Sequence, residues 1–129
     1  MSRVHVYTDG SCNHTTKQGG WGAVLIAGQH QKNLSGKVSN TTNNRMEMTA
    51  VLMALNAIHQ PQSVILFTDS MIVVNGLKNR SGAKANLDLW QQVWDAVDRH
   101  QEVEVQWVPA HSGVKWNEVA DALACYHST

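Results

Sequence analysis

Four acidic residues stand where a carboxylate is hard to explain by folding alone. Asp9 and Asp69 each follow a threonine at the end of an apolar run, and Glu47 and Asp121 lie among apolar or small residues at helical spacing. If the two runs are parallel neighbouring strands, their spacing of about 4.8 Å lets the Asp9 and Asp69 carboxylates reach a common point. Like charges repel each other there unless cations lie between them. Because hard divalent cations prefer carboxylate oxygens, the pattern predicts a divalent metal site.

Each of these acids also has a structural explanation. Asp9 or Asp69 alone could form an Asx-turn or cap the segment that follows it. Glu47 could close a capping box begun by Asn44. Such explanations serve one acid at a time, whereas four acids directed at one place favour a functional site.

Other polar and aromatic residues give weaker signals. His111 lies in a loop after a strand, where an imidazole could exchange protons near a site or could be an inert surface residue. Residues 41–45, Thr-Thr-Asn-Asn-Arg, suit binding of phosphate or sugar hydroxyls and suit plain helix capping equally. Trp90 and Trp94 have the spacing of a core face, and we expect Trp90 to be partly exposed. The histidines and cysteines lack the pair spacings of a zinc site.

Hydrophobic patterning predicts the elements that must position these residues. The expected strands are residues 3–9, 21–27, about 34–38, 64–68 and 103–107. The expected helices are residues 42–59, 70–77, 86–100 and 116–125. The run at 64–68 lacks alternation, which is typical of a strand covered on both faces, and the polar third strand suits a sheet edge. The order predicts an α/β fold with a five-stranded mixed sheet flanked by helices, in which three antiparallel meander strands precede strands 4 and 5, both parallel to the first.

Length and charge limit the alternatives. A chain of 129 residues is expected to form one domain, residues 1–129, with a sizeable core. Ten basic and ten acidic residues give a net charge of zero, so nucleic-acid binding must depend on local arrangement. The sequence has no secretory signal pattern and no apolar run near the roughly 18 residues of a membrane span, which predicts a cytoplasmic protein without a membrane partner. Cys12 and Cys125 are expected to be reduced thiols.

Four short motifs occur along the chain: Asp9-Gly10-Ser11-Cys12, Asn43-Asn44-Arg45-Met46-Glu47, Thr68-Asp69-Ser70, and His111-Ser112-Gly113 followed by Asn117 and Asp121. In this order, and over nearly the whole chain, they resemble the motifs of ribonuclease H, type 1. Any one motif is weak, but four in family order with matching secondary structure are specific. The resemblance implies the ribonuclease H-like fold, which agrees with the sheet expected above.

The resemblance implies endonucleolytic hydrolysis of the RNA strand of an RNA–DNA hybrid, leaving 5′-phosphate and 3′-hydroxyl ends. Asp9, Glu47, Asp69 and Asp121 match the family's metal-binding carboxylates. Two Mg²⁺ ions about 3.5 to 4 Å apart, for which Mn²⁺ could substitute, would activate the attacking water and stabilise the leaving 3′-oxygen. His111 matches the family histidine that assists proton transfer or product release.

Substrate contacts follow from the same resemblance. Residues that match contacts to the hybrid around its 2′-hydroxyls, the group that distinguishes RNA from DNA, are Cys12, Asn43, Asn44, Ser70 and Asn75. Residues that match the family's site for a phosphate of the DNA strand are Asn40, Thr42 and Asn86.

The chain departs from the family pattern in ways that weaken substrate binding. Asn40 stands where some members have arginine, Met71 stands where many bacterial members have glutamine, and residues 13–18 replace a more usual turn. Bacterial members often carry a Trp/Lys-rich handle before the helix expected at residue 86, and this chain has only a few basic residues there. We therefore expect a short form that lacks the basic handle, acts as a monomer, and is aided in substrate binding by a basic partner domain or protein.

Three other interpretations stay open on the sequence. The chain could be the nuclease domain of a reverse transcriptase-like protein, a non-catalytic RNA–DNA hybrid-binding module, or a magnesium-dependent phosphatase. A pure binding module would gain affinity by losing negative charge next to phosphates, so retention of four carboxylates argues against it. The residues that match 2′-hydroxyl contacts argue against the phosphatase.

Overall fold

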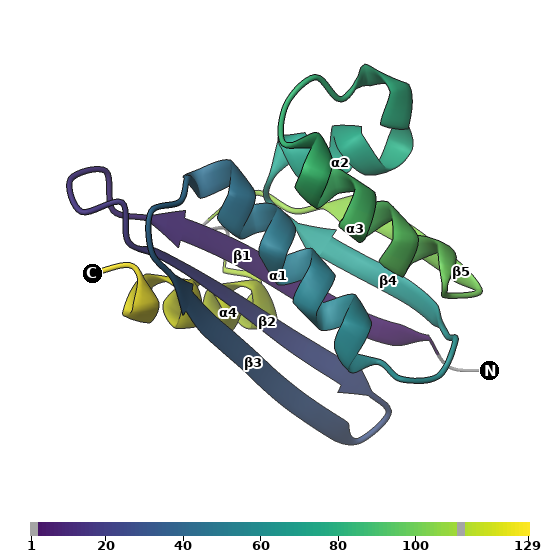
Figure 1. Ribbon diagram of the computed structural model, residues 1–129. Helices are drawn as coiled ribbons and strands as arrows, with labels where there is room; N and C mark the ends of the chain where they lie inside the picture. Colours follow the sequence, from purple (N-terminus) through teal and green to yellow (C-terminus); the bar gives the residue numbers. More distant parts are fainter. Residues whose placement is uncertain (1–2, 111–112) are drawn as a thin grey trace.

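The computed structural model describes residues 3–110 and 113–129, within which a five-stranded sheet lies between helices on both faces (Figure 1). The strands are β1 (Val4–Cys12), β2 (Gly19–Ala27), β3 (His30–Val38), β4 (Ser63–Thr68) and β5 (Glu102–Trp107). The helices are α1 (Asn43–Ala57), α2 (Met71–Lys78), α3 (Leu87–Asp98) and α4 (Lys115–His127), with a 3₁₀ turn at Arg80–Gly82. Each of these helices is too short or too polar to span a bilayer.

The sheet has the strand order β3-β2-β1-β4-β5. β1 pairs antiparallel with β2, and β2 pairs antiparallel with β3, which makes the predicted meander. β4 runs parallel to β1, and β5 runs parallel to β4. The predicted fold class is confirmed, and the polar β3 lies at an edge as expected.

The two faces of the sheet are covered unequally. α1 packs on β1 and β2 with α3 beside it, and α2 lies on the same side near β4 and β5 (Figure 1). α4 covers β1 and β2 from the opposite face.

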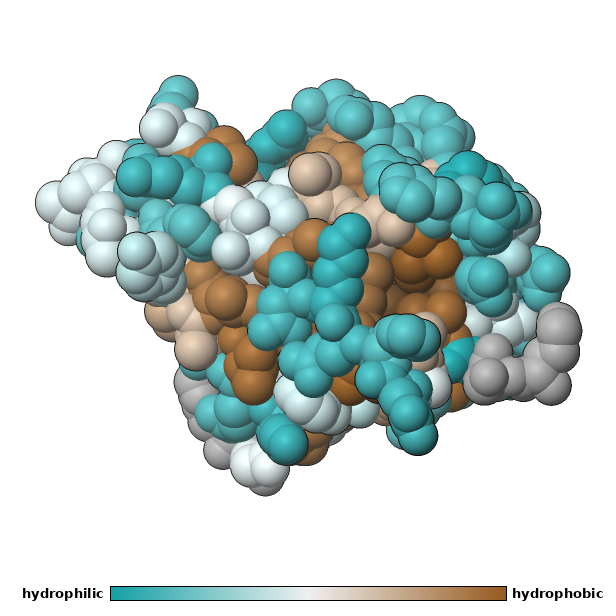
Figure 2. Space-filling view, turned by 90° about the horizontal axis from the view of Figure 1, so that it is seen from below, coloured by the Kyte–Doolittle hydropathy of each residue, from teal (hydrophilic) through white to brown (hydrophobic). Residues whose placement is uncertain are grey.

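Figure 2 views the molecule from the side on which β3 lies in Figure 1, and on this surface hydrophilic residues lie between the hydrophobic ones. On β3 itself Lys32 and Lys37 are exposed, which hinders pairing of this edge with another chain.

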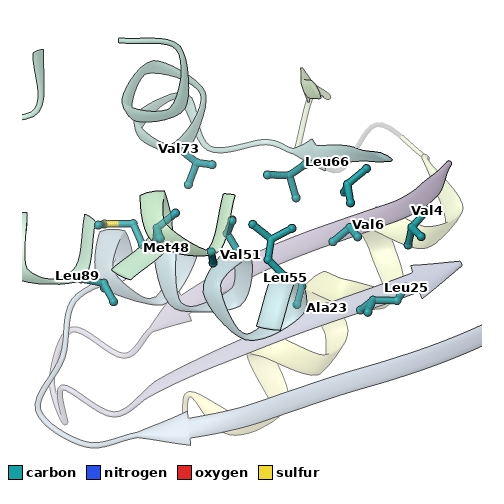
Figure 3. Packing of buried hydrophobic residues seen from close by; sticks show 14 of the residues in the cluster. Val4, Val6, Ala23, Leu25, Met48, Val51, Leu55, Leu66, Val73 and Leu89 are labelled. Carbon is teal, nitrogen blue, oxygen red and sulfur yellow. The ribbon is translucent and has the colours of Figure 1, made fainter. Parts of the chain in front are cut away.

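The main core lies between the sheet and α1. Val6 and Leu66 point from β1 and β4 toward Val51 and Leu55 of α1, and all four side chains are fully buried (Figure 3). Burying each such aliphatic side chain contributes roughly 1.5 to 3 kcal/mol. This packing fixes how α1 lies on the sheet, and therefore where its first turn meets the end of β1.

The prediction that Trp90 is partly exposed was wrong. Its side chain is 2% exposed and packs against Gly76 of α2, where a Cβ would lie 2.2 Å from the indole ring. Trp94 stacks on Trp90 and donates its indole N–H to the Gly76 carbonyl at 3.0 Å. The absence of a side chain at position 76 therefore lets α2 and α3 close over the indole of Trp90.

Two helix starts differ from the sequence interpretation. The cap of α1 is Thr42 rather than Asn44, because the Thr42 hydroxyl accepts a hydrogen bond from the Arg45 backbone N–H at 3.2 Å. Glu47 is thus not part of a capping box. The helix expected from residue 86 begins at Leu87, with Asn86 as its N-cap at φ 56° and without a capping hydrogen bond from the Asn86 side chain.

Candidate active site

Pairing between β1 and β4 stops before the carboxyl end of either strand. β1 pairs with β4 over residues 4–7, and β4 ends at Thr68, whereas β1 continues to Cys12 beside β2. Asp9 therefore lies just past the last residue paired with β4, and Asp69 follows the last residue of β4. Because the strands are parallel, both carboxylates lie at the carboxyl ends of the strands, where α/β proteins commonly bind ligands.

α1 places Glu47 beside the carboxyl end of β1. The helix approaches β1 so closely that a Cβ on Gly10 would lie 2.3 Å from the Glu47 backbone nitrogen. Glu47 is 7% exposed, as expected from the face it shares with buried apolar residues. One carboxylate oxygen from each of Asp9, Glu47 and Asp69 lies within 4.8 Å of the other two. The predicted convergence of these three acids is therefore present in the fold.

Asp121 belongs to α4, which lies on the opposite face of the sheet from α1. α4 lies against β2 so tightly that a Cβ on Gly22 would be 2.4 Å from the Ala120 carbonyl oxygen. Gly22 is also the residue that pairs with Asp9 across β1 and β2. Asp121 consequently lies close enough to Asp9 to help raise the pKa of Asp9, and its carboxyl accepts a hydrogen bond from the Cys125 thiol at 3.7 Å. The fourth acid thus lies next to Asp9, outside the group of three whose oxygens are within 4.8 Å of one another.

The cluster holds protons when no cation is bound. Burial, followed by the charge of Glu47, raises the pKa of Asp9 to about 10. Burial, followed by the charge of Asp69, raises the pKa of Glu47 to about 8. Carboxyls with such pKa values cannot all be ionised together near pH 7 unless positive charge compensates them.

The chemistry of the cluster fits a hard divalent cation. All four side chains offer carboxylate oxygens, which Mg²⁺ and Ca²⁺ prefer. The Glu47 Oε1 atom is buried and has no hydrogen-bond partner within residues 3–110 and 113–129. A buried oxygen without a partner is costly, and coordination of a cation would satisfy it.

The residues expected to contact the hybrid lie in different environments. Asn43 and Asn44 are exposed in the first turn of α1, and Asn75 is exposed on α2. Ser70 is buried as the cap of α2, with its hydroxyl accepting from the Val73 N–H at 3.3 Å. Ser70 directly follows Asp69 in the chain, and its buried hydroxyl already has a structural function.

Cys12, the last residue of β1, is a further expected contact to the hybrid. Cys12 is partly buried, and its thiol donates to the Thr41 carbonyl at 3.4 Å. The predicted proton-transfer residue His111 lies outside the described residues. Its role remains a prediction from the sequence motif.

The expected phosphate-binding residues lie where α1 and α3 begin. Asn40 and Thr42 are exposed, and Asn86 accepts a hydrogen bond from the Arg45 guanidinium at 3.1 Å. Arg45 also binds both carboxylate oxygens of Asp88, at 3.2 and 3.1 Å. Sequence reasoning missed this cluster, because the residues are more than 40 positions apart and no local pattern links them. Sequence reasoning also missed the hydrogen bond from the Trp107 indole N–H to the main-chain oxygen of Asp69.

Comparisons with known proteins point to one family. The RNase H family profile matches residues 1–128. The chain is 43% identical to a protein named Ribonuclease H from Herminiimonas arsenicoxydans, over 96% of the chain and 93% of that protein. It is 44% identical to another Ribonuclease H from Alcanivorax borkumensis, over 96% of the chain and 90% of that protein.

Solved structures give the same result. The crystal structure of LC9-RNase H1, a type 1 RNase H with the type 2 active-site motif, superposes with a TM-score of 0.87 at 32% identity, covering 97% of this chain and 71% of that one. The N-terminal RNase H domain of a Mycobacterium tuberculosis protein shares the fold, with a TM-score of 0.85 at 22% identity, covering 98% of this chain and 94% of that one. The chain therefore belongs to the ribonuclease H family of enzymes.

Proposed function

We propose that this protein hydrolyses the RNA strand of RNA–DNA hybrids at internal positions, leaving 5′-phosphate and 3′-hydroxyl ends. The observation that carries the proposal is the meeting of the Asp9, Glu47 and Asp69 carboxylates within 4.8 Å at the end of two parallel strands. Family membership supports the choice of an RNA–DNA hybrid as substrate.

Asp9, Glu47, Asp69 and Asp121 are proposed to hold two divalent ions. Asp9 is central, because Asp121 lies close enough to it to help raise its pKa and the Glu47 and Asp69 carboxylates lie within 4.8 Å. Mg²⁺ is the expected ion, and Mn²⁺ is expected to substitute. When bound, such a pair of ions supplies activation of the attacking water and stabilisation of the departing oxygen.

The surrounding residues are proposed to bind and orient the substrate. Asn43, Asn44, Asn75, Ser70 and Cys12 would contact the hybrid around its 2′-hydroxyls, which supports selection of RNA over DNA. His111 would assist proton transfer or product release.

A second group would hold the DNA strand. Asn40, Thr42 and Asn86 are proposed to bind one of its phosphates. We further propose that residues 1–129 form one domain that acts as a monomer in the cytoplasm, and that a basic partner domain or protein aids substrate binding.

Incubation with four end-labelled substrates tests the activity: RNA–DNA, RNA–RNA, DNA–DNA and single-stranded RNA, each with Mg²⁺ or with EDTA. We expect cleavage of the RNA strand of the hybrid only, with Mg²⁺ only, and no cleavage by Asp69→Asn. Asp95→Asn is the matched control, because Asp95 is an exposed acid on α3. Binding of the hybrid without cleavage under all conditions would instead support a non-catalytic hybrid-binding module.

A further inference from the structure

Trp107 differs from the tryptophans that form the core. It is the last residue of β5, at an edge of the sheet, and its side chain is 48% exposed. Trp21 and Trp90 are 7% and 2% exposed. The indole N–H of Trp107 donates a hydrogen bond to the main-chain oxygen of Asp69 at 3.2 Å. A half-exposed tryptophan is therefore bound directly to the backbone of one of the clustered acids.

This bond continues the pairing of β4 with β5 by one residue. Thr68 is the register partner of Trp107, and the Val108 N–H donates to the Thr68 carbonyl at 2.9 Å. The indole then reaches the next carbonyl along the chain, that of Asp69. On the other side of β4, pairing with β1 ends at Phe67. Asp69 thus lies beyond the β1 ladder, and β5 is the strand that reaches it.

Asp69 needs such support because of its neighbours. Its carboxylate lies within 4.8 Å of the Asp9 and Glu47 carboxylates, so electrostatic repulsion favours its withdrawal when the cluster is ionised. The residue also sits at the junction between the end of β4 and Ser70, the cap of α2. A shift of the Asp69 backbone at this junction would lengthen the hydrogen bond from the Trp107 indole and would carry the Asp69 carboxylate away from the cluster.

We propose that Trp107 is a positioning residue for the metal site. Its indole N–H fixes the Asp69 carbonyl and so keeps the Asp69 carboxylate beside Asp9 and Glu47, where divalent cations bind. The inference rests on the cation binding proposed for these acids, but the effect of Trp107 on cation affinity does not depend on cleavage of the hybrid. A net contribution typical of one neutral hydrogen bond corresponds to roughly two- to tenfold in Mg²⁺ affinity.

The test compares two substitutions that remove the same group. Trp107→Phe removes the indole N–H but keeps an aromatic ring. Trp94→Phe is the matched control, because it removes an indole N–H that donates to a backbone carbonyl, that of Gly76, at 3.0 Å between α2 and α3. For each protein, Mg²⁺ affinity is measured by calorimetric titration, and stability is measured by urea unfolding in EDTA.

Trp107→Phe is expected to weaken Mg²⁺ binding about two- to tenfold, and Trp94→Phe is expected to leave Mg²⁺ affinity unchanged while lowering stability. In cleavage assays, the Mg²⁺ concentration at half-maximal rate should rise for Trp107→Phe, with most of the rate recovered at saturating Mg²⁺. Unchanged Mg²⁺ affinity in Trp107→Phe, or an equal loss in both variants, would overturn the proposal. A wild-type protein that binds Mg²⁺ but cuts no duplex would refute the proposed function, and the comparison of Mg²⁺ affinities would still decide the role of Trp107.

Discussion

Replacing Asp9 with asparagine should stabilise the metal-free protein at neutral pH while abolishing cleavage. Asp9 is 4% exposed, and its burial, followed by its closeness to Glu47, Asp69 and Asp121, makes its ionisation unfavourable. Asparagine has nearly the same shape and carries no charge. The variant should therefore fold at least as well without metal and should lose a metal ligand, with cleavage falling by several orders of magnitude.

The sign and size of the stability effect follow from the pKa values. The pKa of Asp9 rises from 3.8 to about 10, and that of Glu47 from 4.5 to about 8. The folded protein therefore retains protons that the unfolded chain releases. The stability linked to these protons is fully present below about pH 4 and is lost as the pH rises toward about 8 for Glu47 and about 10 for Asp9. Each retained proton costs about 1.4 kcal/mol of unfolding free energy per pH unit within that window. Asp9→Asn removes one retained proton and should flatten the decline by about that amount.

Urea unfolding in EDTA at pH 5, 6 and 7 measures this slope for the wild type, Asp9→Asn and the exposed-acid control Asp95→Asn. Mg²⁺ should reverse the ranking, because a ligand at a hundred times its Kd stabilises the wild type by about 2.7 kcal/mol and should stabilise Asp9→Asn less. Equal pH slopes for wild type and Asp9→Asn in EDTA would refute the assignment of a retained proton to Asp9. Equal Mg²⁺-induced shifts would remove Asp9 from the ligands.

Three further predictions concern the helix contact, proton transfer and substrate affinity. Gly10→Ala should destabilise the protein by about 1 to 3 kcal/mol in urea unfolding, because its Cβ would meet the Glu47 backbone at 2.3 Å; Gly82→Ala, whose Cβ meets only the Asn79 side chain, should cost less. His111→Ala should lower turnover roughly ten- to a hundredfold with unchanged Mg²⁺ affinity by calorimetry, and a variant as inactive as Asp9→Asn would contradict an auxiliary role. Binding of hybrid to Asp69→Asn should be weak with a shallow salt dependence between 50 and 200 mM salt, since each neutralised phosphate adds only about 0.9 to the logarithmic slope; a steep slope with tight binding would show a basic surface that this reasoning misses.

The sheet and the acid cluster were predictable because both depend on local patterns. The apolar runs before Asp9 and Asp69 identify two strands, and parallel pairing of such strands brings their ends together. The face that Glu47 shares with Val51 follows from helical periodicity. These features need no knowledge of distant contacts.

The errors came from contacts between distant segments. Periodicity placed Trp90 on the packed face of α3, but its full burial depends on Gly76, in another helix. The Arg45–Asp88 pair and the bond from Trp107 to Asp69 likewise join residues far apart in sequence. Asparagine and threonine are both good caps, so the choice of Thr42 over Asn44 depended on where α1 could begin after β3.

α4 packs on the face of the sheet opposite the main core, and this affects the order in which the site forms and is lost. Of the described residues in the main hydrophobic cluster, none belongs to α4. Among the four acids, Asp121 is the farthest along the chain from Asp9. Bringing these two residues together costs the most chain entropy and is slow. Local opening of a peripheral element needs less free energy than global unfolding. Hydrogen exchange should therefore show α4 exchanging before α1, and mild denaturant should abolish activity through release of α4 while the sheet and its core remain folded.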